Sequence, residues 1–155
     1  MKRIIHIMSL VSILSFFSCS AWNSGWKNAH ITEFSYSYDG TIGRNSYHHT
    51  VKVTEQGPIL EIQDMHHWGK DKLVLSISPE FVQALEELCR KHNVMRYDGF
   101  KKTNRHVCDG SGFSLYIRYD NGQKVDAYGM NRSPKGYHDF ESDLRELFQP
   151  YLEEE

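Results

Sequence analysis

The stretch Cys108–Gly112, CDGSG, has residue types that could form a ligand-cradling glycine loop beside a reactive thiol. It does not match GxGxxG, it lacks the Lys-Ser/Thr pair of a P-loop, and Asp109 stands where GxSxG needs its first glycine. A phosphate loop also leads into a helix, whereas this stretch leads into an expected strand. The sequence therefore favours an entry turn that needs Gly110 or Gly112 at positive φ. Asp109 as an active-site carboxylate is the alternative.

Histidine is the other residue type that could do chemistry, and two pairs stand out, His48-His49 and His66-His67. Adjacent residues of a strand point to opposite faces, so neither pair can chelate one ion. One member of each pair could still meet, for example His67 with His48. The chain has no HExxH, no paired CxxC and no carboxylate-rich loop. We therefore expect no metal and no cofactor.

The first residues have the order of a secretory signal. Lys2 and Arg3 precede the apolar run Ile4–Phe17, and small residues follow at positions 18–21. An apolar run of this length is too short for a transmembrane helix, which needs about 20 apolar residues. We expect an exported protein.

The end of this segment, SFFSC, resembles the lipobox of bacterial lipoproteins. In that family a small residue precedes a cysteine that is lipidated and becomes the mature N-terminus, and Ser18 and Cys19 match. Phe16 departs from the family, which usually has Leu there. The resemblance implies a signal peptide at residues 1–18 and a lipid on Cys19 that anchors the chain to a bacterial cell envelope membrane. Ordinary cleavage after Ala21 is the alternative.

Length and composition indicate one folded domain after the signal. Removing residues 1–18 from the 155 leaves 137, enough for one core but not comfortably for two. We expect a tether at residues 19–28 and a single domain at residues 29–155. The formal net charge of the whole chain is −2, so the basic balance typical of nucleic-acid partners is absent.

The two cysteines after Cys19 form a candidate disulfide, Cys89 with Cys108, because export favours oxidation. Two separate thiols, with Cys89 buried on a helix face, are the alternative. A nucleophilic pair of Cys108 with His106 is disfavoured, because an exported cysteine that can be oxidised is a poor thiolate.

Alternation of apolar and polar residues predicts four strands in succession. In the first, Phe34 and Tyr36 share one face, and in the second Tyr47 and Val51 do, with His49 packed between them. The segments PILEIQDM and KLVLSI supply two more. Their short connections indicate an antiparallel meander, since parallel neighbours need longer crossovers.

Two helices are expected on one face of the sheet. Ser78 followed by Pro79 is a helix start signal, and a stripe at helical spacing follows. Its members are Phe81, Leu85, Leu88 and Cys89. A final helix is expected over residues 137–152, ended or kinked by Pro150. Its stripe is Phe140, Leu144, Leu147 and Tyr151.

Between the helices, side-chain parity predicts a hairpin. A loop of Asp120, Asn121 and Gly122 pairs Ile117 with Val125, with Gly122 left-handed in a G1 bulge. The outer face of this hairpin is the candidate binding surface, since Tyr and Arg are enriched in interfaces. Its residues are Tyr116, Arg118, Lys124, Asp126 and Tyr128. We thus expect an α+β domain with an antiparallel sheet of about six strands: meander, helix, hairpin, helix.

The block from Gly99 to Leu144, which contains V.DG..FSL.I..DNG, is similar to small lipoproteins of gut bacteria that have no assigned activity. The resemblance covers about a third of the chain and adds support to the exported α+β interpretation. We expect a binding or assembly module of the cell envelope, with the membrane and an envelope protein or ligand as partners. The alternative is a small hydrolase or metal-binding protein that uses His66, His67 or Asp109.

Overall fold

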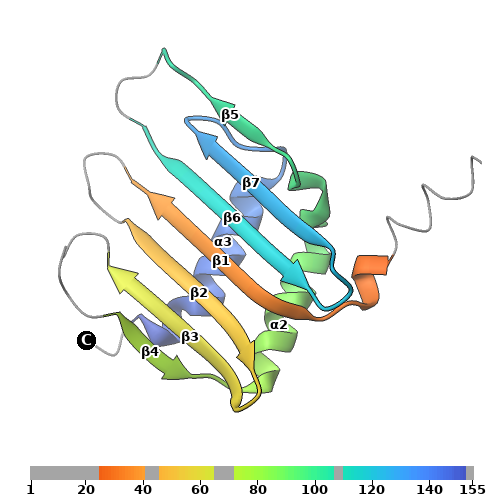
Figure 1. The fold of residues 1–155 in the computed structure, drawn as a ribbon. Coiled ribbons are helices and arrows are strands. Elements are labelled where there is room, and N and C mark those ends of the chain that lie inside the picture. Colours follow the sequence, from red (N-terminus) through yellow and green to blue (C-terminus); the bar gives the residue numbers. More distant parts are fainter. Residues whose placement is uncertain (1–24, 41–45, 65–71, 107–109, 153–155) are drawn as a thin grey trace, which may run out of the picture.

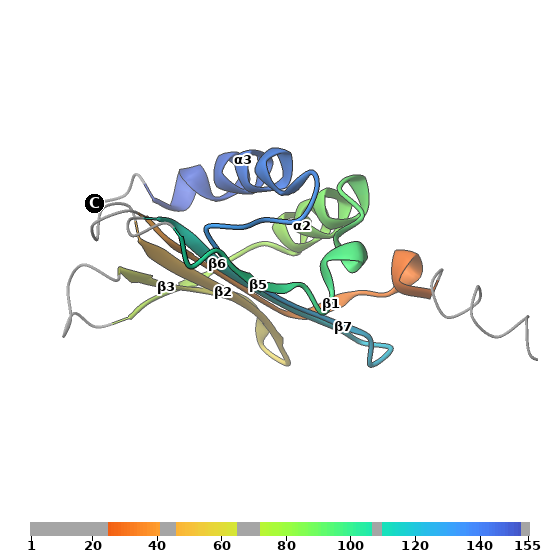
Figure 2. The ribbon, with the colours of Figure 1, turned by 90° about the horizontal axis from the view of Figure 1, so that it is seen from above.

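A computed structural model describes residues 25–40, 46–64, 72–106 and 110–152. They form one seven-stranded sheet with the strand order β4-β3-β2-β1-β6-β7-β5, and both α-helices lie on the same face of it (Figures 1 and 2). The strands are β1 Ile31–Asp39, β2 Tyr47–Thr54, β3 Gly57–Asp64, β4 Leu73–Ser76, β5 Lys101–Thr103, β6 Gly112–Tyr119 and β7 Lys124–Met130. The helices are α2 Pro79–Lys91 and α3 Tyr137–Phe148, with 3-10 turns η1 Gly25–Asn28, η3 Val94–Tyr97 and η4 Gln149–Tyr151.

The α+β class is confirmed, and the sheet differs from the prediction in detail. It has seven strands instead of about six, and it is mixed, because β5 pairs parallel with β7. Strand β5 was not predicted, because its three residues are all exposed and show no apolar alternation. Parallel neighbours need a long connection, and here β6 lies between β5 and β7 in the chain and supplies it.

The meander and the hairpin pair as the parity argument predicted. Strands β1 to β4 are antiparallel in succession. In the hairpin, Ile117 pairs with Val125. Gly122 has φ 81°, and its N–H donates to the Tyr119 carbonyl at 3.0 Å. The left-handed residue therefore lies where the three-residue loop requires it.

Helix α2 begins at the predicted signal. The Ser78 Oγ accepts a hydrogen bond from the Phe81 N–H at 3.2 Å, and Pro79 occupies the first turn. Cys89 is buried, as its place in the stripe predicted. Glu86 is also buried, and it accepts the Ile31 N–H at 2.9 Å and pairs with Arg90 at 3.0 Å. This carboxylate ties α2 to the start of β1.

Helix α3 is shorter than predicted. It ends at Phe148, and η4 follows with Pro150 in its first turn. Proline cannot donate a backbone hydrogen bond within an α-helix, which accounts for the change of helix type. Phe148, outside the predicted stripe, is buried in the core.

The folded part of the chain includes η1. Trp26 is buried and packs against Tyr119, with ring centroids 6.5 Å apart. The predicted tether is therefore folded against the domain from Gly25 onward, while residues 1–24, with Cys19, lie outside the described residues. Within the described ranges, no helix has the length and apolar character needed to cross a membrane.

Candidate functional site

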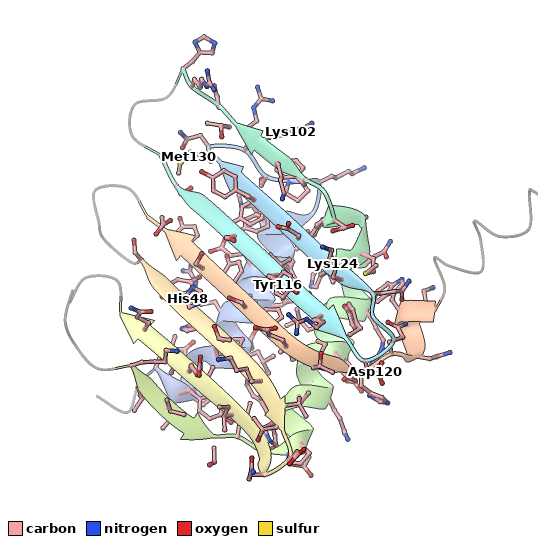
Figure 3. All side chains as sticks on the ribbon, in the orientation of Figure 1. His48, Lys102, Tyr116, Asp120, Lys124 and Met130 are labelled. Atoms are coloured by element: carbon pink, nitrogen blue, oxygen red, sulfur yellow. The ribbon has the colours of Figure 1, made fainter. Side chains whose placement is uncertain are left out.

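The predicted binding surface lies on the sheet face without helices. Tyr116 pairs with Asp126, and Arg118 with Lys124, and Figure 3 labels Tyr116 and Lys124 on the neighbouring strands β6 and β7. Tyr128 pairs with Ser114 and is exposed. All five predicted residues thus share one face of the sheet.

Two charged residues of this surface, Arg118 and Asp126, pair with charged residues beside it. The Arg118 guanidinium donates to the Tyr116 hydroxyl at 3.1 Å and lies 3.1 Å from a Glu33 oxygen. The hydrogen bond to Tyr116, ahead of the Glu33 charge, raises the pKa of Arg118. Asp126 pairs with Lys101 at 2.8 Å. Exposed pairs of this kind contribute little to stability.

The hydrolase and metal-binding alternatives would use His66, His67 or Asp109. His66, His67, Cys108 and Asp109 lie outside the described residues, so their roles, and the pairing of Cys108 with Cys89, stay predictions. Cys89 itself is buried, and burial raises the pKa of its thiol. Among the described residues, no three His, Cys, Asp or Glu side chains are grouped to hold a metal ion.

The two adjacent histidines of β2 point to opposite faces, as predicted. On the open face, His48 Nε2 lies 3.0 Å from Thr50 Oγ1, and burial lowers its pKa, with the Lys72 charge adding to the effect. On the helix side, His49 is buried. Its ring stacks on Tyr47 at 4.9 Å and on Phe148 at 4.8 Å between centroids.

The helix-side residues of β1 and β2 form, together with the end of α3, an apolar hollow of about 300 Å³. Register places Tyr36 beside His49, and the i,i+4 spacing of Leu144 and Phe148 places both on one side of α3. The lining residues are Tyr36, Ser46, Tyr47, His49, Leu144, Arg145, Phe148 and Leu152. We name this cavity the aromatic hollow.

His49 contributes an unusual polar atom to the wall of the aromatic hollow. Its Nε2 is buried and has no hydrogen-bond partner. Burial, with a smaller effect of the His48 charge, lowers the pKa of His49 to about 4. The imidazole is therefore neutral at pH 7. A buried polar atom without a partner typically costs about 1–3 kcal/mol.

The two tyrosines that line the hollow, Tyr36 and Tyr47, interact with polar side chains around them, including Tyr137 outside the hollow. The hydroxyls of Tyr36 and Tyr137 are 2.6 Å apart, and Tyr47 interacts with Tyr36 and Arg145. Burial raises the pKa of Tyr36, Tyr47 and Tyr137. Arg145 donates to Glu141 at 2.7 Å. Because the tyrosines stay protonated and none lies beside a basic group of matched pKa, the arrangement suits binding better than proton transfer.

A second hollow of about 510 Å³ lies beside the glycines of CDGSG and the start of α3. The predicted positive φ is wrong, because neither Gly110 nor Gly112 has one. Gly110 is needed for a different reason: a Cβ there would lie 1.3 Å from Asn131 Oδ1. Gly112 is buried against Met130, whose Cε lies 3.0 Å from the position of an added Cβ. Close packing, and not turn geometry, explains both glycines.

Sequence reasoning placed His49 between Tyr47 and Val51 but missed the hollow around it. The missing partners were Arg145 and Phe148, which lie about 100 positions away in the chain. The available signal was the i,i+4 pair Leu144 and Phe148, which extends the apolar stripe of α3. No protein-family model and no curated protein matches the chain.

Proposed function

We propose that this chain is a lipid-anchored binding module of the bacterial cell envelope whose ligand site is the aromatic hollow. The observation that carries the proposal is His49, a polar side chain kept without a hydrogen-bond partner in the wall of an apolar hollow. Residues that violate local packing rules at a stability cost tend to mark functional sites. A concave apolar pocket with a few polar groups and a perturbed pKa is also the usual form of a ligand site.

Sequence supports the anchor. SFFSC resembles a lipobox, and five residues separate Cys19 from Gly25, where the described fold begins. The domain would therefore stay close to the membrane that holds the lipid. The open face with Tyr116 and Arg118 would remain available for an envelope protein.

Binding is favoured over catalysis by the chemistry of the hollow. Its tyrosines have raised pKa values, and its imidazole is neutral and held by ring stacking. The hydrolase and metal-binding alternatives depend on His66, His67 and Asp109, which lie outside the described residues.

The test uses the full-length chain isolated from membranes. Its intact mass should show loss of residues 1–18 and diacylglyceryl modification of Cys19, and a loss of about 2 Da would report a Cys89–Cys108 disulfide. Cleavage after Ala21 without lipid would contradict the anchor.

A small-molecule fragment screen by methyl NMR tests the site on the same protein in lipid nanodiscs. Fragments should shift the methyl signals of Leu144 and Leu152, and Leu152→Trp, which fills the mouth of the hollow, should abolish these shifts. Leu147→Trp, in the outer cleft between the helices, is the matched control and should leave them intact. A screen without any shift in the hollow would refute the ligand site.

A further inference from the structure

The aromatic hollow continues into a smaller one. A cavity of about 170 Å³ adjoins it and shares four lining residues with it. The shared residues are Ser46, Tyr47, His49 and Leu152. The smaller cavity extends to Ile62 of β3 and Leu73 of β4. The two cavities are therefore parts of one groove, which runs from Leu144 of α3 to the β4 edge of the sheet.

The groove has exposed apolar side chains along it. Leu152 is 40% exposed and Leu73 is 45% exposed, although both line the groove. Exposed leucines beside an apolar groove leave surface that an apolar ligand can cover, and burial of such surface is favourable by about 25 cal/mol per Å². The elongated shape suits a flexible chain better than a single ring.

Charge is confined to the Arg145 end. Among the described residues that line the two cavities, only Arg145 is charged at neutral pH, because the pKa of His49 is about 4. Its side chain is 57% exposed and donates one Nη2 hydrogen bond to Glu141. A guanidinium has five N–H donors, so it can bind a second carboxylate while it keeps the first.

We propose that the groove binds a single-chain aliphatic acid, with the carboxylate at Arg145 and the chain extending past His49 toward Leu73. This inference rests on the proposed function, because it identifies the ligand class of the same site. The acid end would pair with Arg145, which keeps its hydrogen bond to Glu141, and the chain would cover both exposed leucines. An aromatic acid or a neutral lipid would satisfy only one of these two features.

The experiment compares octanoate, decanoate, dodecanoate and 1-decanol on the full-length chain in nanodiscs. Equilibrium dialysis gives the free ligand concentration and so removes the effect of uptake into lipid. We expect affinity to rise about fourfold per added methylene and decanoate to bind about tenfold more tightly than decanol. Methyl NMR shifts of Leu144, Leu152 and Leu73 should report both ends of the groove.

Variants separate the two ends of the ligand. Arg145→Gln should remove the preference for decanoate over decanol and leave the affinity for decanol unchanged. Arg105→Gln, at an exposed arginine after β5, is the control and should change neither the preference nor the decanol affinity. Leu73→Ser should weaken binding of the longer acids. Val74→Ser, at the next residue on the opposite face of β4, is its control.

Three outcomes would overturn the inference: affinity independent of chain length, equal affinity for decanoate and decanol, or equal effects of Leu73→Ser and Val74→Ser. If other fragments shift the methyl signals of the hollow while the acids do not, the inference fails and the proposed function stands. If no compound shifts these signals, the proposed function fails as well.

Discussion

His49 shows how one side chain can link stability to the candidate site. Its ring is held between Tyr47 and Phe148, and its buried Nε2 has no hydrogen-bond partner. Ring stacking stabilises the folded state, whereas burial of Nε2 without a partner destabilises it. A phenylalanine would keep the ring stacking and remove the cost of burying the nitrogen.

We therefore expect His49→Phe to stabilise the protein at pH 7 by about 1–3 kcal/mol, measured by urea denaturation. The exposed His138→Gln is the control, with no change beyond about 0.5 kcal/mol. A destabilised His49→Phe protein would show that Nε2 has a favourable partner in the native state.

The same residue predicts a pH dependence. The folded pKa of His49 is about 4 against about 6.5 when unfolded, so between these values the unfolded chain binds more protons. Stability is then complete above about pH 6.5 and falls as pH drops toward 4, by up to about 3 kcal/mol from this residue. His48, whose pKa is also lowered, adds in the same direction. His49→Phe should remove most of this slope, and an unchanged slope would contradict the assignment.

At the scale of elements, the β6–β7 hairpin depends on the backbone of Gly122. Its φ of 81° is strained for a residue with a Cβ, although an added Cβ would meet no neighbour within 4 Å. Gly122→Ala should therefore destabilise the protein by about 1–2 kcal/mol, by backbone strain alone. Gly25→Ala is the matched control, since Gly25 has no positive φ and an added Cβ there would make only ordinary contacts. Equal effects of the two substitutions would argue against the left-handed turn.

Elements whose determinants are local could be predicted from the sequence. The hairpin register followed from parity and one Asn-Gly turn, and the start of α2 followed from Ser78 and Pro79. Strand β5 could not be predicted, because it is held by backbone pairing to β7 and has no apolar face of its own. Gly110 was misinterpreted for a similar reason, since its constraint comes from Asn131, about 20 residues away.

The sequence predicted the face of the sheet on which His49 lies but not the hollow around it, because the hollow depends on residues far apart in the chain. The period-two pattern placed His49 on the core face of its strand. The hollow, however, exists because α3 crosses that strand with Arg145 and Phe148 toward it, and the relation of a helix to a strand far away in the chain is not encoded in local pattern.

At the scale of the whole molecule, the tether and the groove lie at opposite ends of the sheet. Gly25 lies near the hairpin turn, since an added Cβ there would be 3.7 Å from the Gln123 side chain. At the other end of β1, Tyr38 pairs with Tyr47, which lines the groove. Figures 1 and 2 show η1 and the C-terminal end of α3 on opposite sides of the molecule. The nine residues of β1 span roughly 30 Å.

This arrangement predicts how a lipid-anchored domain is oriented. The five residues between Cys19 and Gly25 let these two Cα atoms lie at most about 20 Å apart, so the hairpin turn should lie near the membrane and the groove should face away from it. In a Cys108→Ser background, a label at Asn121→Cys should be quenched by a headgroup quencher more strongly than a label at Asp39→Cys. Insertion of about 20 Gly/Ser residues after Cys19 should remove the difference, because a flexible linker of that length spans about 25 Å and no longer fixes orientation. The reverse order of quenching would place the groove at the membrane surface, where an aliphatic ligand would enter it directly from the bilayer.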